Sequence, residues 1–332
     1  MEVCVVGAGY WGPNLARNFL IQDAVSRVHI CDLERERLVA IQKTFPMMEI
    51  EQDYEKILKN IDISIVAIAT PVSSHFSLAK QALLAGKHVL VEKPMTSTSA
   101  QAQELMDIAR EKDLVLMVDH TFIYTSAVEK MKELVEDGTI GEISYFDSTR
   151  INLGLFQHDV NVVWDLAPHD LSIMLHLMKE RPVAVLATGI DHLNNGLEDI
   201  AYITLFFTEN TMAHFHLSWM SPVKVRKTIV GGTQKMMVYD DMEPDEKIKV
   251  YAKGIDITTQ EEINHAQVQY RIGDVHIPVL ENKEALYNEM SHFIDCVQNG
   301  TTPRTGAEYG LWVVRVLEAA EQSIKENKKV LL

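Results

Sequence analysis

The chain has 332 residues, of which 47% are hydrophobic and 23% are charged, a composition typical of globular proteins. This length suits two domains of roughly 150 residues each. The net charge of −16 results from 31 basic and 47 acidic residues. Such a balance disfavours nucleic acids and anionic membranes as partners, because phosphate-rich surfaces attract basic proteins.

The three cysteines do not indicate disulfide bonds or a metal site. Cys4, Cys31 and Cys296 are odd in number and widely spaced, which favours neither disulfides nor a cysteine-bound metal. No run of about 18 apolar residues is present, and the N-terminus leads directly into an apolar run without a signal segment. We therefore expect a reduced, cytoplasmic compartment and no membrane association.

The first motif is a glycine-rich turn. The apolar run 3–6 predicts a buried strand, residues 14–20 begin a helix, and Gly7, Gly9 and Gly12 between them form G-x-G-x-x-G. In a dinucleotide fold the first glycine permits a tight turn, the second lets a pyrophosphate approach, and the third lets helix and strand pack closely. Tyr10 and Trp11 complete the turn. The glycine pattern between a strand and a helix favours a nucleotide site over a plain strand-turn-helix corner.

An acidic residue follows the second predicted strand. Asp32 comes after the run 27–31 and lies 20 positions beyond Gly12, where dinucleotide folds place the acceptor for a ribose hydroxyl. A carboxylate there favours NAD over NADP, because it repels a 2′-phosphate. Arg35 and Arg37 complicate this choice, although their run is more typical of an exposed helix surface.

The first 120 residues alternate between strands and helices. Further strands are predicted at 61–69, 88–91 and 114–118, and helices at 33–44, 54–58, 73–85 and from a cap at Ser97 or Ser99 to 112. This alternation predicts a doubly wound, parallel Rossmann sheet, which binds ligands beyond the carboxyl ends of its strands. The residues expected to hold the cofactor there are Gly7, Gly9, Tyr10, Trp11, Gly12, Asp32, Thr70, Pro71, His75, Glu92, Lys93 and His120.

The pattern changes in the second part of the chain. A strand at 143–150 and a helix reaching 178 precede β-like runs at 183–190, 200–207, 211–217, 224–230 and 235–239. Short spacers between these runs predict an α+β domain with a mostly antiparallel sheet. Residues 240–274 are charged and are expected to form an irregular, exposed excursion. We divide the chain into domains 1–120 and 121–332, with the two C-terminal helices able to pack back on the first domain.

Lys93 is the sharpest catalytic candidate. It leaves a buried strand between Glu92 and Pro94, and Pro94 restricts the preceding residue to extended conformations. An ammonium held there can bind a reacting hydroxyl and stabilise a developing alkoxide. The alternative is a structural ion pair with a neighbouring carboxylate.

A second candidate is the segment from Trp164 to Asp170. Because proline is tolerated only in the first helical turn, Pro168 predicts that the helix begins near Trp164 or Asp165. Asp165 and His169 then share one face, and the aspartate can leave the imidazole suited to acid–base work. Such a pair is often structural, and its spacing with neighbouring histidines does not resemble a zinc site, so we expect no metal.

These motifs together resemble the Gfo/Idh/MocA family of nicotinamide-dependent oxidoreductases. The resemblance extends over nearly the whole chain through the glycine turn, Glu92-Lys93-Pro94 and Asp165-x-x-x-His169. It implies a Rossmann domain followed by an α/β domain with a large open sheet, whose outer face commonly builds homodimers or homotetramers. It also implies that Lys93, His169 and Asp165 are catalytic, and that NAD is the cofactor.

The turn sequence and the Trp164–Asp170 segment look like a branch associated with nucleotide sugars, including UDP-N-acetylglucosamine 3-dehydrogenases. The resemblance therefore implies hydride transfer from a sugar ring hydroxyl, with formation of a 3-keto sugar. Expected substrate-binding residues are Lys93, Arg150, Asn152, Trp164, Asp165 and His169, while His158 lies close to them in sequence. For Trp164 two roles remain: its ring stacks near the nicotinamide or the sugar, or it packs in the core.

Three alternative functions share some of these sequence features. A dehydrogenase of a free sugar or an inositol would use the same residues. A non-catalytic NAD-binding regulator has no need of Lys93 and His169. A methyltransferase using S-adenosylmethionine shares the glycine turn but has no use for either residue.

Overall fold

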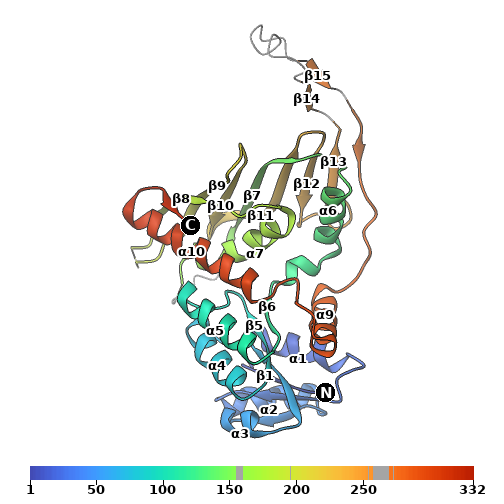
Figure 1. Ribbon diagram of the computed structural model, residues 1–332, viewed down its shortest axis with the longest axis vertical. Coiled ribbons are helices and arrows are strands. Elements are labelled where there is room, and N and C mark those ends of the chain that lie inside the picture. Colours follow the sequence, from blue (N-terminus) through green and yellow to red (C-terminus); the bar gives the residue numbers. More distant parts are fainter. Residues whose placement is uncertain (155–159, 195, 253, 257–268, 272) are drawn as a thin grey trace. The chain divides into compact units, whose positions relative to one another are not determined.

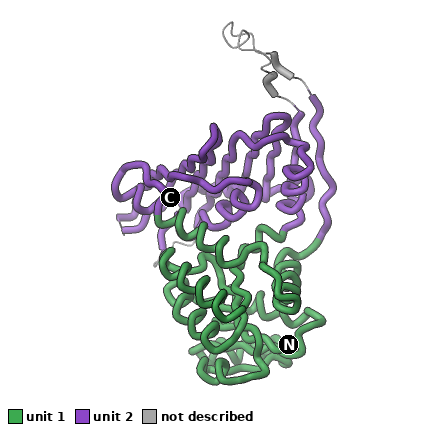
Figure 2. Tube along the Cα trace, viewed as in Figure 1, with its two compact units in different colours: residues 1–124, 283–318 green, residues 125–282, 319–332 purple. Residues whose placement is uncertain are grey.

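The structure is a computed structural model that describes residues 1–154, 160–194, 196–252, 254–256, 269–271 and 273–332. The chain divides into two compact units, shown in Figure 2. The first comprises residues 1–124 and 283–318, and the second comprises residues 125–282 and 319–332. The first unit thus includes a C-terminal segment that the division at residue 120 assigns to 121–332. His158 lies outside the described residues.

The first unit contains a six-stranded parallel sheet in the order β3-β2-β1-β4-β5-β6, as the sequence predicts. Its strands are β1 (Glu2–Val6), β2 (Arg27–Cys31), β3 (Glu49–Glu51), β4 (Ile63–Ile68), β5 (His88–Glu92) and β6 (Leu116–Asp119). The strand order reverses between β1 and β4, and open parallel sheets bind ligands beside such a reversal. The edge strand β3 was not predicted.

Helices cover this sheet. They are α1 (Gly12–Leu20), α2 (Arg35–Thr44), α3 (Tyr54–Lys59), α4 (Val72–Leu84), α5 (Ser99–Glu111), the 3₁₀ turn η1 (Thr121–Tyr124) and α9 (Ala285–Asn299). Figure 1 shows α4 and α5 packed together on one side of the sheet, with α1 and α9 together on the other. The cap of α5 is Thr98, whose hydroxyl accepts from the Gln101 N–H at 3.2 Å, rather than either neighbouring serine.

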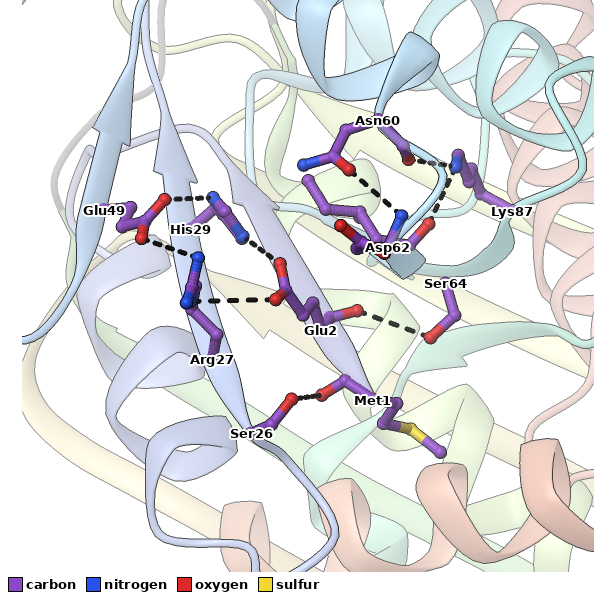
Figure 3. Close-up of polar contacts among 11 residues, drawn as sticks. Met1, Glu2, Ser26, Arg27, His29, Glu49, Asn60, Asp62, Ser64 and Lys87 are labelled. Atoms are coloured by element: carbon purple, nitrogen blue, oxygen red, sulfur yellow. Dashed lines mark hydrogen bonds and ion pairs between the residues drawn. The ribbon is translucent and has the colours of Figure 1, made fainter.

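The end of the sheet where the strands begin carries a structural network of polar contacts (Figure 3). The buried Lys87 ammonium donates to the carbonyls of Asn60 and Ile63, both at 2.7 Å. On the neighbouring strands, His29 lies 2.7 Å from the carboxylate of Glu2. These groups stabilise the amino ends of the strands, at the opposite end of the sheet from the predicted cofactor residues.

The second unit is built on a nine-stranded sheet in the order β16-β13-β12-β11-β7-β10-β9-β8-β17. Its strands are β7 (Ile143–Leu153), β8 (Ala184–Ile190), β9 (Ile200–Phe206), β10 (Met212–Ser218), β11 (Met220–Gly232), β12 (Met236–Asp240), β13 (Ile248–Tyr251), β16 (Val275–His276) and β17 (Val330–Leu331). Among these neighbours only β7 and β10 pair in parallel, which confirms a mostly antiparallel sheet.

Two details differ from the sequence-based expectations. The segment 240–274 is not wholly irregular, because β13 pairs with β12 and extends the large sheet. Strands β14 (Gly254–Asp256) and β15 (Gln269–Arg271) form a separate two-stranded sheet.

Helix α7 (Val162–Leu177) packs on β7, β9 and β10, while α6 (Ser126–Glu136) packs on α7. Helix α10 (Ala307–Glu326) contributes to both units.

Helix α7 begins earlier than predicted. Its cap is Asn161, whose side-chain oxygen accepts from the Trp164 N–H at 3.1 Å, so Pro168 lies inside the helix instead of in its first turn. Pro168 has no N–H to donate to the carbonyl of Trp164. Extensive burial of the helix on the sheet, with Ala167, Leu171 and Met174 in the core, stabilises it despite this missing bond.

Candidate active site

The glycine turn has room for a ligand at one position only. Gly7 has φ +104°, and a Cβ there would lie 2.5 Å from the carbonyl oxygen of Ala69. A Cβ at Gly12 would overlap with the Gly7 carbonyl, so Gly12 allows the close approach of α1 to the turn. A Cβ at Gly9 would meet nothing within 4 Å. The open space at Gly9 fits the approach of a dinucleotide pyrophosphate to the backbone.

Asp32 is held against this turn at the end of β2. One carboxylate oxygen accepts from the Ala8 N–H at 2.6 Å and the other accepts from the Glu34 N–H at 2.8 Å. The side chain is therefore oriented where a ribose hydroxyl acceptor is expected. The Arg37 guanidinium lies 4.0 Å from Asp32 and 3.1 Å from Glu34, so this arginine lies beside the position that distinguishes NAD from NADP.

His75 joins two turns at the ends of β4 and β5. The side chain is buried, with Nε2 2.7 Å from the carbonyl oxygen of Thr70 and Nδ1 2.9 Å from that of Pro94. Burial lowers the pKa of His75, and the nearby Lys93 acts in the same direction. Both ring nitrogens face protein carbonyls, so His75 holds the turn around Thr70 and Pro71 to the turn around Lys93.

Glu92, Lys93 and His120 occupy the ends of β5 and β6. The Lys93 N–H donates to the Glu92 carboxylate at 2.9 Å, and the Lys93–Pro94 peptide bond is cis. His120 is only 1% exposed, and neither ring nitrogen has a hydrogen-bond partner among the described residues. Burial lowers the pKa of His120 to about 4, so its imidazole is neutral at neutral pH.

Trp11 connects the glycine turn to β6. Its indole Nε1 donates to Asp119 Oδ2 at 2.9 Å, and the ring stacks beside Tyr10 with a centroid separation of 6.5 Å. Tyr10 itself is 92% exposed. The predicted first-unit residues therefore gather around the carboxyl ends of the parallel strands.

The second unit holds Asp165 and His169 on α7. The Asp165 carboxylate accepts from the Trp219 indole Nε1 at 3.0 Å, and His169 is half-buried one turn later. Trp164 is 8% exposed and donates from its indole to Glu321 at 2.9 Å. This contact favours the core role for Trp164.

The predicted substrate residues on β7 have different surroundings. Arg150 is 3% exposed and donates to both carboxylate oxygens of Asp170, at 2.9 and 2.8 Å. This two-bond ion pair connects β7 to the residue after His169, so it orients α7 directly. Asn152 is half-buried further along the strand.

Comparison with known proteins identifies the family. Residues 1–120 match the model described as "Oxidoreductase family, NAD-binding Rossmann fold", and residues 128–238 match the GFO/IDH/MocA C-terminal domain. The chain belongs to the Gfo/Idh/MocA family. Its first unit accordingly carries the family's NAD-binding Rossmann domain, in agreement with the open position at Gly9.

Individual relatives of this Gfo/Idh/MocA protein differ in substrate. A scyllo-inositol 2-dehydrogenase (NADP⁺) of Bacillus subtilis is 24% identical, with coverage of 100% of this chain and 96% of the relative. A UDP-N-acetylglucosamine 3-dehydrogenase of Acidithiobacillus ferrooxidans is 29% identical, with coverage of 66% and 67%. The crystal structure of GenD2 from gentamicin A biosynthesis, in complex with NAD, superposes with a TM-score of 0.83 at 22% identity, covering 100% and 96%. The chain is thus a dehydrogenase-type oxidoreductase, and its relatives act on varied substrates.

Sequence reasoning missed Glu289, a fully buried acidic residue on α9. It follows Leu286 by three positions and precedes Phe293 by four, so it lies on the apolar stripe of the helix. A charged residue at such a position is the signal that could have identified it.

No group of three or more His, Cys, Asp or Glu residues in the described ranges is arranged to hold a metal ion. Across the same part of the chain, no helix has the length and apolar character needed to cross a bilayer.

Proposed function

We propose that this protein oxidises a ring hydroxyl of a sugar with NAD, and that its substrate is a nucleotide sugar such as UDP-N-acetylglucosamine, converted to its 3-keto form. The observation that carries the proposal is the gathering of an open glycine turn, Asp32 and the Lys93 turn at one end of a parallel sheet. The similarity to a UDP-N-acetylglucosamine 3-dehydrogenase supports the choice of substrate.

In this proposal Lys93 and His169 have different roles toward the substrate hydroxyl. Bound NAD supplies the hydride acceptor. His169 takes the hydroxyl proton while the carbon–hydrogen bond breaks and the carbonyl forms. Lys93 donates a hydrogen bond to the same oxygen and stabilises its developing negative charge. Asp165, oriented by Trp219, stabilises the imidazolium that His169 becomes.

A free sugar or an inositol is the second candidate substrate. Arg150, one of the predicted substrate-binding residues, donates from two of its nitrogens to Asp170 inside the second unit. That pairing weakens the case for a nucleotide diphosphate at Arg150. The full-length similarity to a scyllo-inositol dehydrogenase points in the same direction.

A substrate screen tests the proposal. Formation of NADH or NADPH is measured with UDP-sugars, free hexoses and inositols, using NAD and NADP in parallel. We expect turnover with a UDP-N-acetylhexosamine and NAD. Turnover only with inositols would select the second candidate, and no reduction with any of them would favour a regulator.

Replacing the two proposed catalytic side chains tests the mechanism. Lys93→Ala and His169→Ala should each reduce kcat by on the order of 10²-fold or more, because each removes a group that acts in the transition state. NAD affinity should change little, as titration would show. Lys112→Ala, at an exposed position at the end of α5, is the matched control. Normal turnover in either site variant would contradict the assigned role.

We also propose that the second unit self-associates into a homodimer or homotetramer. Helix α7 contacts one face of the nine-stranded sheet, while Tyr202, on the strand face that alternates with the buried residues, is 43% exposed. Its ring stacks on His216 at 4.5 Å and on His214 at 6.1 Å. These flat aromatic surfaces suit contact with a second copy of this sheet. Tyr202→Glu should lower the molar mass measured by light scattering, and an unchanged mass would argue against this face.

A further inference from the structure

Three carboxyl groups, Glu92, Asp119 and Glu289, approach one another inside the first unit, and we call them the carboxyl cluster. Parallel pairing of β5 with β6 places Glu92 beside Asp119. Glu289 reaches Asp119 from α9 and is fully buried, and Asp119 is 2% exposed. Like charges this close in a dry interior repel strongly, so the three groups cannot all be ionised.

The three carboxyl groups differ in the donors available to them. Asp119 accepts from the Trp11 indole at 2.9 Å and from the Thr121 hydroxyl at 2.6 Å, so each of its oxygens has a donor. Neither oxygen of Glu289 has a donor among the described residues. The nearby backbone N–H of His120 already donates to the Val118 carbonyl at 2.9 Å. If Glu289 carries a proton, it can share this proton with Asp119 in a hydrogen bond, and the buried carboxyl group is no longer without a polar partner.

Like Glu289, Glu92 favours its protonated form. Burial raises its pKa well above the usual value, and the charge of Asp119 adds to this effect. Burial likewise raises the pKa of Glu289, again with a contribution from Asp119. Among the described residues, titratable groups near the cluster include Lys93, His120 and Tyr124. Arg304, His292 and Cys296 lie around Tyr124. The positive charge of Lys93 lowers the pKa of Glu92, but this effect is smaller than the increase caused by burial and by Asp119.

We propose that the carboxyl cluster is a proton-holding positioning site for the cofactor turn, with Glu289 as its key residue. Its protons allow Asp119 to remain an acceptor for Trp11, the residue that immediately precedes α1 and Gly12. On the other side, Glu92 accepts from the Lys93 N–H, so one cluster connects the glycine turn to the Lys93 turn. Loss of a proton adds a negative charge beside Asp119, and the resulting repulsion displaces the Trp11 and Lys93 turns. NAD then binds less tightly.

The pH dependence of NAD binding tests this proposal without any substrate, so its failure is separate from failure of the proposed sugar oxidation. NAD is titrated into the full chain by calorimetry from pH 6 to pH 9.5. We expect the wild-type dissociation constant to rise on the alkaline side, by up to about tenfold per pH unit while one proton is linked. Glu289→Gln, which keeps an amide donor to Asp119, should have a smaller rise. Glu308→Gln, at an exposed position on α10, should follow the wild type.

Identical pH profiles for the wild type and Glu289→Gln would overturn the role of Glu289. If that variant fails to fold, the wild type alone is decisive. NAD binding at alkaline pH, measured in buffers of different ionisation enthalpy, should take up a fraction of a proton. No proton uptake at any pH would overturn the proposal.

Discussion

At the scale of single residues, two glycines of the same turn have different roles: Gly9 leaves space for the cofactor, and Gly12 allows α1 to pack. A methyl group at Gly9 meets open space, whereas one at Gly12 overlaps with the backbone of Gly7. Gly9→Ala should therefore unfold at the wild-type temperature but bind NAD at least about tenfold more weakly, because the methyl occupies the space of the pyrophosphate. Gly12→Ala should lower the free energy of unfolding by on the order of 1–3 kcal/mol or more, because helix α1 has to move.

Thermal unfolding without cofactor and NAD titration give the two measurements, and each variant serves as the control for the other. Wild-type NAD affinity in Gly9→Ala would show that the pyrophosphate does not approach the turn at this position. Wild-type stability in Gly12→Ala would show that α1 adjusts without cost.

Single residues also show where sequence reasoning ends. Asp32 and the three glycines could be located because their backbone roles require particular residue types at particular spacings. The partner of Arg150 could not be inferred, because Asp170 lies 20 positions away and meets it only after α7 packs on β7. Glu289 lies on the apolar stripe of α9, and the sequence alone does not show that Asp119 lies beside this position in the fold.

At the scale of elements, burial decides which segments could be predicted. The strands β1, β4 and β5 are nearly continuous buried apolar runs, and such runs identify the interior of a parallel sheet. Strand β3 has three partly or fully exposed residues, and β13 is a short strand inside a charged segment. Both are strands because a neighbouring strand offers them hydrogen bonds, which local sequence does not reveal.

Helix α7 shows tertiary packing overriding a local rule. A proline normally marks the first turn of a helix, yet Pro168 lies in the interior of α7. The helix begins at Val162 because Asn161 caps it, and Asn161 is itself held by Glu198 at 2.7 Å. The prediction placed Asp165 in the first turn, and it remains there in the observed helix. The face shared by Asp165 and His169 therefore does not depend on the exact start.

At the scale of the whole molecule, buried titratable groups should limit stability on both sides of neutrality. His120 has a folded pKa of about 4 against an ordinary value of 6.5, so the unfolded chain binds more protons between these values. The contribution of His120 therefore destabilises the fold as the pH falls from 6.5 towards 4. Glu92 and Glu289 act in the opposite sense, since their raised pKa values mean that the folded state binds more protons above pH 4.5. Their contribution to stability is lost as the pH rises towards the folded pKa values.

We therefore expect the cofactor-free protein to be most stable in mildly acidic solution, with unfolding temperatures that fall on both sides of the maximum. His120→Asn should reduce the acidic decline, because its side chain does not titrate. Glu289→Gln should raise the unfolding temperature at pH 8.5 more than at pH 5.5, since an uncharged amide avoids the cost of ionising a buried carboxyl group. Scanning calorimetry of the three proteins at pH 4.5, 5.5, 7 and 8.5 measures both effects. Equal changes for Glu289→Gln at every pH would mean that this carboxyl group binds the same number of protons in the folded and unfolded chains over that range, so that folding does not raise its pKa.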